Sequence, residues 1–208
     1  MTYDYSSAIL SSMTHGKLVL LIGPSGVGKS VILKTLHERH PELIFPKSAT
    51  TRARRQGEGD QLYHFVSDDD FTQWIKEKKF LEWAQVHQGA RYGTLLSEIL
   101  PSIEQGRIVV REVDVQGFQS IRVHPLFVKG GQYRLQTIFI LPESEEQLIS
   151  HIEKRAPMER EELQRRLVSM HKELAHAKET DIQITNAEGG LDRTIAKVEE
   201  VVFEKCES

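Results

Sequence analysis

Cysteine is almost absent from the sequence. The 208 residues include a single one, Cys206, which cannot form an internal disulfide. This fits a reducing compartment, where thiols stay unpaired. The first sixteen residues have no basic segment, and their apolar run is too short for a signal peptide or a membrane span. We therefore expect a cytoplasmic protein with no membrane partner.

An excess of positive charge is also missing. Lys and Arg total 27 and Asp and Glu total 30, which gives a formal net charge of −3. Binding to nucleic acid without sequence preference needs Lys and Arg spread over a broad face. The sequence therefore predicts no nucleic-acid partner, and any anion site must be local.

Short apolar runs alternate with helical patterns along much of the chain. The first run, KLVLLI at 17–22, has the composition of a strand buried on both faces. Further strands are predicted at 108–113, 137–141 and 181–185, and helices follow them at 115–123, 144–155 and 191–203. This order predicts an α/β fold with a parallel sheet and flanking helices.

Two regions interrupt the alternation. Residues 48–94 are rich in turns and aromatics, with strand-like pieces at 63–66 and 80–86 around a helix that begins at the acidic run 68–70. We expect them to form a small inserted lobe. Residues 144–179 are charged helix formers, which by themselves predict a solvated helical hairpin. The core would then comprise 1–47, 95–143 and 180–208.

The loop after the first strand has the sequence GPSGVGKS, which matches G-x-x-x-x-G-K-[ST] between a strand and a helix. Its glycines let backbone N–H groups turn toward phosphate oxygens. Lys29 adds charge near the β and γ phosphates, and the Ser30 hydroxyl can bind Mg²⁺. The loop predicts a P-loop, a binding site for a nucleoside triphosphate. Its residues are Gly23, Pro24, Ser25, Gly26, Val27, Gly28, Lys29 and Ser30.

A second anion site is indicated by the segment SATTRARRQGEGD at 48–60. Arg52 and Arg55 lie three residues apart, and two guanidinium groups can hold a phosphate bidentately. An arginine pair on a loop is by itself more often solvated. Its interpretation therefore depends on the rest of the chain.

Five motifs in order resemble the guanylate kinases, which phosphorylate GMP from ATP. They are the P-loop, S-x-T-T-R-x-x-R-x-G-E, F-L-E-W-A, Y-G-T and D-V-Q-G, and the likeness covers about 17–203. The resemblance implies a P-loop NTPase-type fold in which 48–94 is a GMP-binding lobe and 144–179 a helical lid and hinge region. It implies ATP and GMP as substrates and Mg²⁺ as cofactor.

The resemblance also assigns roles to individual residues. Four side chains would hold the GMP phosphate: Arg52, Arg55, Tyr63 and Tyr92. Two carboxylates, Glu82 and Asp114, would read guanine with the hydroxyl groups of Ser48 and Thr94. The expected catalytic residues are Lys29, Arg52, Arg155 and Arg166, the last two on the lid. Asn186 matches an adenine-contacting position.

The chain departs from the family pattern on one strand. Where the family usually has an apolar residue and then Asp, this chain has Arg111 and Glu112. Side chains alternate along a strand, so Glu112 and Asp114 point the same way, and we expect Glu112 near the water shell of Mg²⁺. The loops 58–63 and 82–92 differ from the pattern by one residue each.

Two other classes of function stay open. Guanylate-kinase-like domains also serve as peptide-binding modules, although these often lack the P-loop lysine and the base-reading residues. A kinase for a different phosphate ester on the same fold is the other. That alternative would not explain why one chain contains Ser48, Glu82, Thr94 and Asp114 together.

Overall fold

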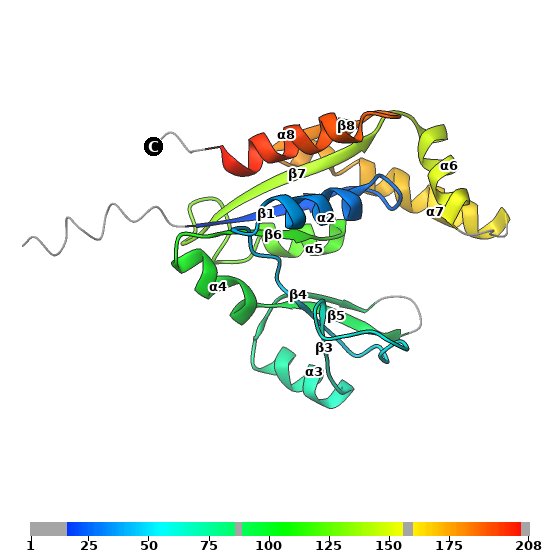
Figure 1. Ribbon diagram of the computed structural model, residues 1–208. Helices are drawn as coiled ribbons and strands as arrows, with labels where there is room; N and C mark the ends of the chain where they lie inside the picture. The colour runs from blue at the N-terminus through cyan, green and yellow to red at the C-terminus, as the bar shows by residue number, and fades with distance from the viewer. Residues whose placement is uncertain (1–15, 86–88, 156–159, 205–208) are drawn as a thin grey trace, which may run out of the picture.

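The main sheet has β1 near its centre. The computed structural model describes residues 16–85, 89–155 and 160–204 (Figure 1). β1 (Lys17–Ile22) is buried along its whole length and pairs in parallel with β6 (Ile108–Glu112) and β7 (Arg134–Pro142). β8 (Ile182–Asn186) extends the sheet beyond β7, giving the order β6-β1-β7-β8. The predicted α/β fold with a parallel sheet is confirmed.

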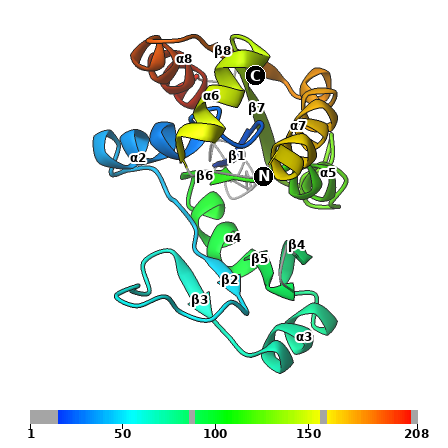
Figure 2. The same cartoon turned by 90° about the vertical axis from the view of Figure 1, so that its right-hand side faces the viewer.

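The alternation of side chains along β1 divides the core into two layers. Val19 and Leu21 pack against helices α2 (Lys29–Arg39), α6 (Glu145–Arg155), α7 (Arg160–Leu174) and α8 (Leu191–Phe203). Leu18, Leu20 and Ile22 face α4 (Leu96–Glu104) and α5 (Val115–Arg122). Figure 2 shows α2 and α8 on one side of the sheet and α5 on the other. Burying each of these aliphatic side chains contributes roughly 1.5–3 kcal/mol, which explains why an uninterrupted apolar run forms this strand.

A second, smaller sheet lies below the first in Figure 1. Its order is β3 (Tyr63–Phe65), β2 (Ser48–Thr50), β5 (Arg91–Leu95) and β4 (Phe80–Gln85). Helix α3 (Asp68–Lys76) packs on it through Phe71, whose ring stacks on that of Phe80 with the centroids 4.4 Å apart. A Cβ at Gly93 would lie 2.6 Å from the Phe80 ring, so glycine is needed on β5.

The element boundaries differ from the sequence-based ones in a few places. α3 begins after Ser67, whose hydroxyl caps the Asp70 N–H, so the acidic run occupies the first turn and not the cap. β7 begins at Arg134, three residues earlier than predicted. β2, β5, α4 and the short 3-10 helix η2 (Ala177–Glu179) were not predicted, since short elements carry little pattern. Among the described residues, no helix combines the length and the apolar character needed to cross a membrane.

Candidate functional site

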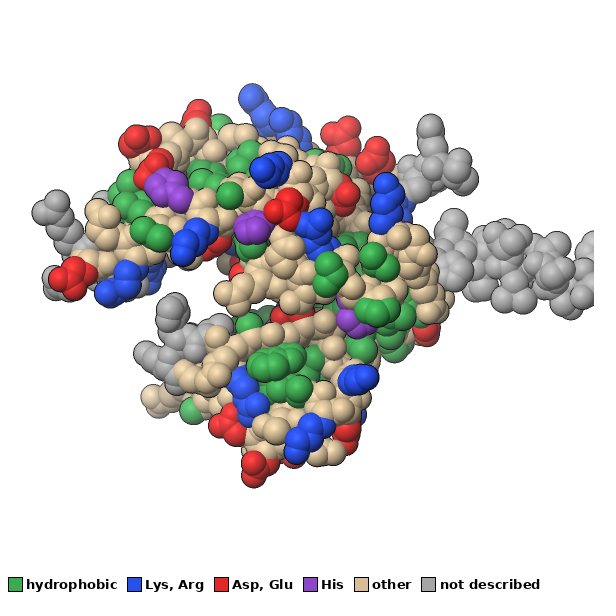
Figure 3. Space-filling model, turned by 180° about the vertical axis from the view of Figure 1, so that it is seen from behind, with side chains coloured by type: hydrophobic (Ala, Val, Ile, Leu, Met, Phe, Trp, Pro, Cys, Tyr) green, Lys and Arg blue, Asp and Glu red, His purple; other side chains and the backbone are tan. Residues whose placement is uncertain are grey.

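A cleft of about 550 Å³ lies between the carboxyl ends of β1 and β6 and the smaller sheet. Figure 3 shows it from behind as a hollow between the two parts of the molecule. Ligands of open α/β sheets bind at this edge, beside the strand where the order reverses. The lining residues are Gly23, Ser25, Gly26, Gly28, Lys29, Ser30, Ser48, Tyr63, Glu82, Ala84, Tyr92, Arg111, Glu112, Val113, Asp114 and Glu173.

The loop at one end of the cleft has a shape that only glycine permits. Gly23 has φ of 148°, and a Cβ there would lie 2.5 Å from the Ile140 carbonyl oxygen. Gly28 has φ of 101° and is the last residue before α2. The N-terminus of α2 therefore opens directly on the cleft, where its partial positive charge favours an anion.

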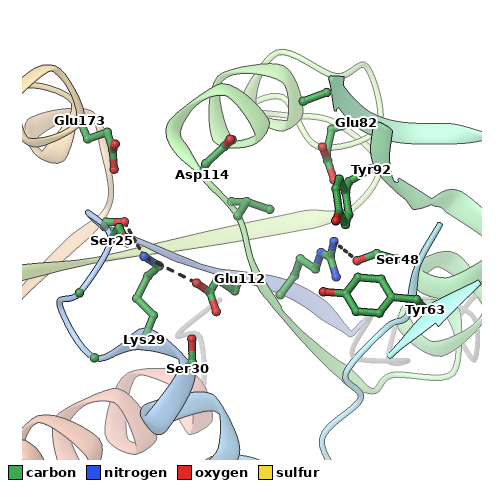
Figure 4. Close-up of a pocket in the computed structure, with 16 residues that line it drawn as sticks. Ser25, Lys29, Ser30, Ser48, Tyr63, Glu82, Tyr92, Glu112, Asp114 and Glu173 are labelled. Atoms are coloured by element: carbon green, nitrogen blue, oxygen red, sulfur yellow. Dashed lines mark hydrogen bonds and ion pairs between the residues drawn. The ribbon is translucent and has the colours of Figure 1, made fainter. Parts of the chain in front are cut away.

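Lys29 is held at the base of this loop. Its Nζ donates to the carbonyl oxygens of Gly23 and Pro24, at 2.6 and 3.1 Å, and lies 3.6 Å from Oε1 of Glu112. The ammonium group is thus buried but close to the cleft, as Figure 4 shows. A phosphate that entered the loop would meet a cation already in position.

The residues around Lys29 fit a magnesium ion. Ser30 is exposed and lines the cleft, as does Glu112 (Figure 4). Mg²⁺ usually takes one or two protein oxygens and completes its octahedron with water and phosphate oxygens. It therefore does not require a dedicated cage, and the described residues contain no group of three or more His, Cys, Asp or Glu side chains that could form one.

Two carboxylates lie at the other end of the cleft. Glu82 on β4 is opposite Thr94 on β5 and accepts a short hydrogen bond from its hydroxyl. Burial raises the pKa of Glu82; the Thr94 hydrogen bond and the charge of Arg111 oppose this, and Asp114 adds to it. Asp114 caps α5 by accepting the Gly117 N–H at 2.7 Å. Both carboxylates line the cleft and can accept hydrogen bonds from a ligand there.

Arg52 is not itself among the residues that line the cleft, but it lies against Tyr63 and Tyr92, which are. Two of its nitrogens donate to the Glu58 carboxylate at 2.9 and 2.7 Å, and its Nε donates to the Tyr92 hydroxyl at 3.1 Å. The guanidinium also lies over the rings of Tyr63 and Phe65, 5.4 Å from each centroid. The hydrogen bonds from Arg52 lower the pKa of Glu58 to about 2. Arg52 is therefore a pre-oriented cation beside the two tyrosines of the cleft.

Several expected site residues lie elsewhere. The Arg55 side chain is exposed and does not line the cleft, and its backbone N–H donates to Glu58. Asn186 is buried: its Nδ2 donates to the Val27 carbonyl at 2.9 Å and its Oδ1 accepts from Thr194 at 3.0 Å. It lines a separate pocket of about 290 Å³ on the other side of the loop 23–28.

Of the two expected lid arginines, only Arg166 has a described side chain, and it is not among the residues that line the cleft. Arg166 is exposed on α7. Arg155 is the last residue of α6, and its side chain is outside the part of the chain that the structure describes. In Figure 1 both helices extend beyond the carboxyl edge of the main sheet.

Two charged residues of the cleft received no role from the sequence. Glu173 reaches the cleft from α7, and burial raises the pKa of its carboxyl group. Arg111 on β6 donates to the Ser48 hydroxyl at 2.6 Å. A charged residue inside the apolar run IVVREV was the available signal for Arg111. Nothing in the pattern around Glu173 separates it from the other charges of its helix.

The chain is similar to known proteins over nearly its whole length. A family model described as guanylate kinase matches residues 15–205. A guanylate kinase of a Synechococcus species is 36% identical over 92% of this chain and 100% of its own length. One from Caldanaerobacter subterraneus is 37% identical over 95% of this chain and 92% of its own. The crystal structure of guanylate kinase from Anaplasma phagocytophilum, 22% identical, covers 91% of this chain and 85% of its own with a TM-score of 0.65, and supports the fold.

Proposed function

The chain belongs to the guanylate kinase family and is a nucleoside monophosphate kinase, and from this premise we propose that it transfers the γ-phosphate of ATP to GMP and dGMP with Mg²⁺ as cofactor. One observation supports this most strongly. A single cleft is lined by the P-loop, with Lys29, at one end and by Glu82 and Asp114 at the other. Both substrates can therefore bind in one cavity with their phosphates between these ends.

ATP would place its triphosphate on residues 23–30. The α2 N-terminus and Lys29 offer positive potential to the β and γ phosphates. Mg²⁺, held by the phosphates, Ser30 and, through water, Glu112, would neutralise part of their charge. Asn186 would act on the nucleoside side indirectly, because its amide supports the loop at Val27.

GMP would place its base against the smaller sheet. Guanine presents two donors, N1–H and the amino group, and these suit the carboxylates of Glu82 and Asp114. Thr94 orients Glu82 through its hydrogen bond, and Ser48 would donate to O6. Adenine would bring its N1 acceptor against a carboxylate, a mismatch that can cost 10⁴-fold or more in such sites.

The transfer itself needs positioning and charge more than proton chemistry. A GMP phosphate oxygen is already anionic near neutral pH and can attack in line without a general base. Arg52, Arg55, Tyr63 and Tyr92 would orient this phosphate. Closure of the GMP-binding lobe 48–94 and the lid 144–179 would bring in Arg155 and Arg166 and exclude water.

An assay of ADP formation with several acceptors tests the proposal. We expect turnover with GMP and dGMP and little with AMP, UMP or CMP, in the presence of Mg²⁺ and ATP. A peptide-binding module on this fold would bind ligand without turning it over. Failure to phosphorylate GMP, in a protein shown by calorimetry to bind ATP, would overturn the proposed activity.

Arg52 offers a sharper test because a neighbouring arginine supplies a matched control. Arg52→Ala should lower kcat by about 10²-fold, since it removes a pre-oriented cation from beside the GMP phosphate. Arg52→Lys should recover little of the loss, because an ammonium group cannot hold both Glu58 and a phosphate oxygen in the same plane.

The control is Arg54→Ala. Arg54 pairs with Asp60 at 2.5 Å and lies over Phe65, away from the cleft lining. Its removal should leave kcat within about twofold, as is usual for exposed ion pairs. Steady-state kinetics with GMP as the varied substrate makes the comparison. Wild-type turnover in Arg52→Ala would mean that the phosphate lies elsewhere.

A further inference from the structure

Arg111 brings a charged group into an apolar layer. It lies on β6 beside Leu20 of β1, and its strand neighbours Val109 and Val113 belong to the apolar cluster on that layer. The side chain lines the cleft next to the smaller sheet. An arginine stays protonated at neutral pH, so its charge must be stabilised where it lies. Burying such a cation is costly unless polar groups surround it.

The guanidinium is only partly satisfied by the protein. Nη2 donates to the Ser48 hydroxyl at 2.6 Å and Nη1 to the Pro46 carbonyl at 3.4 Å. Nε is buried and has no hydrogen-bond partner. Within the described residues, no carboxylate lies at ion-pairing distance from Arg111, although Glu82 and Glu112 are close enough to favour its charge. Burial lowers the pKa of Arg111 in spite of them. The Arg111 guanidinium, which lines the cleft, is therefore a positive charge that protein acceptors satisfy only in part.

The hydrogen bond from Arg111 limits what Ser48 can do. A hydroxyl group has one hydrogen and two lone pairs. Because Oγ of Ser48 already accepts the Nη2–H, it is held in place and polarised, and its own hydrogen is available for an acceptor. A serine without this partner could rotate and either donate or accept. With Arg111 in place, a ligand N–H that donated to Ser48 would lie beside the guanidinium donors, which is unfavourable.

Ser48 belongs to a row of side chains across the smaller sheet. It lies opposite Thr94 on β5, and Thr94 lies opposite Glu82 on β4. Glu82 ends this row with an acceptor, and Ser48 begins it with a hydroxyl whose hydrogen can be donated. Figure 4 shows these two side chains lining the cleft. The row therefore suits a purine edge that has a carbonyl at one position and N–H groups beside it. Guanine has this pattern, and a 6-aminopurine has a donor where the carbonyl would be.

We propose that Arg111 is a positioning residue for base specificity, which fixes the Ser48 hydroxyl as a donor to the carbonyl oxygen at C6 of the purine substrate. The inference rests on the proposed function, since it concerns the acceptor nucleotide. It adds a residue that the family pattern does not supply, because that pattern usually has an apolar side chain at this position. It also gives the partly buried charge of Arg111 a function in the selection of substrate.

Two pairs of nucleotides, used as phosphoryl acceptors, test recognition at C6 and at C2 of the base separately. GMP and the 5′-monophosphate of 2,6-diaminopurine riboside differ at C6 and in the N1 proton that accompanies the carbonyl. GMP and IMP differ only in the amino group at C2. The C6 ratio is kcat/KM for GMP divided by kcat/KM for the diaminopurine nucleotide, and it measures discrimination at C6. The C2 ratio is kcat/KM for GMP divided by kcat/KM for IMP, and it measures discrimination at C2.

We expect Arg111→Met to lower the C6 ratio by about tenfold or more, as for the loss of a charge-assisted hydrogen bond. The C2 ratio should stay within about twofold, and the loss with GMP should fall mainly on KM. Arg111→Lys, which can still donate to Ser48, should restore much of the C6 ratio. An unchanged C6 ratio in Arg111→Met, or an equal fall in both ratios, would overturn the inference.

A double-mutant cycle with Ser48→Ala tests whether Arg111 acts through the hydroxyl. In the Ser48→Ala background, Arg111→Met should lower the C6 ratio no further. A full additional loss would contradict a role through Ser48. ATP binding measured by calorimetry checks that each variant is folded. If Arg111→Met does not fold, the lysine variant and Ser48→Ala decide: the first should keep the C6 ratio and the second lower it.

The controls separate this inference from the proposed activity. A wild-type protein that does not phosphorylate GMP would remove the proposed function itself. A wild-type protein that is active on GMP, with a C6 ratio insensitive to both Arg111→Met and Ser48→Ala, would remove only the role of Arg111.

Discussion

Replacing Lys29 by methionine is expected to lower kcat for phosphoryl transfer to GMP by about 10³-fold or more. Methionine has a similar length, so it fills the same space without the charge. The lost cation is buried against the carbonyl of Gly23 in the loop 23–30, where the phosphates of ATP are proposed to bind. Removing a single pre-positioned donor from a transition state costs about 10²–10³-fold, and an ammonium group on a phosphoryl oxygen belongs at the upper end.

Lys34 supplies the control for this prediction. It lies on the same helix, α2, where it forms an exposed pair with Glu38 at 3.8 Å. Lys34→Met should leave kcat within about twofold. Single-turnover measurement of ADP formation separates transfer from product release, and calorimetry with GMP shows that the base end of the cleft is intact. Transfer in Lys29→Met within tenfold of wild type would mean that the triphosphate does not bind in this loop.

The glycine-rich loop 23–30 and the main sheet were largely predictable from the sequence because their determinants are local. KLVLLI specifies a strand buried on both faces, and β1 occupies those six residues. The glycines at 23 and 28 indicate a tight loop, and both have positive φ values and close contacts that exclude other residues. The pattern of the segment 17–30 thus determines both the strand and the loop that follows it.

The end of the cleft at the smaller sheet, where the nucleobase is proposed to bind, could not be predicted from local sequence patterns. Ser48, Thr94 and Glu82 come together only through the register of β2, β5 and β4, which join segments far apart in the chain. Strand register depends on long-range packing and not on the composition of a three-residue strand. The resemblance to guanylate kinases supplied these residues, and periodicity did not.

Arg55 and Asn186 show a second limit. The spacing of Arg52 and Arg55 suggested equivalent roles, but Glu58 binds the side chain of one and only the backbone N–H of the other. Asn186, which matches an adenine-contacting position, lies beside the loop 23–28, and both ends of its amide have protein partners. Motif position predicts where a residue lies in the fold, whereas its hydrogen-bond partners depend on neighbours that the motif does not include.

Glu82→Gln is expected to lower the preference for GMP over AMP by about 10²-fold, measured as the ratio of kcat/KM. The carboxylate of Glu82 accepts hydrogen bonds only, which suits the donors of guanine. Glutamine keeps an oxygen for one donor but also presents an N–H group, which can pair with N1 of adenine. Each charge-assisted hydrogen bond contributes about 1.5–3 kcal/mol, so losing this distinction should reduce the rate with GMP and raise that with AMP.

Glu77→Gln supplies the matched control, because Glu77 lies at the end of α3 in the same part of the molecule, paired with Lys79 away from the cleft lining. It should leave the ratio unchanged. An unchanged ratio in Glu82→Gln would remove Glu82 as a reader of the base.

The pH dependence provides an independent check on the same carboxylate. Burial raises the pKa of Glu82, and only its ionised form presents acceptors alone to the donors of guanine. The value of kcat/KM for GMP should therefore fall as the pH drops through this raised pKa, at a higher pH than for an exposed glutamate. Glutamine does not titrate, so Glu82→Gln should lose this acidic limb while keeping the slope that arises from the phosphate of GMP itself. If Glu82→Gln kept the whole acidic limb of the pH profile, that limb would arise from another titrating group. A residue other than Glu82 would then have to accept the hydrogen bonds of the guanine N–H groups.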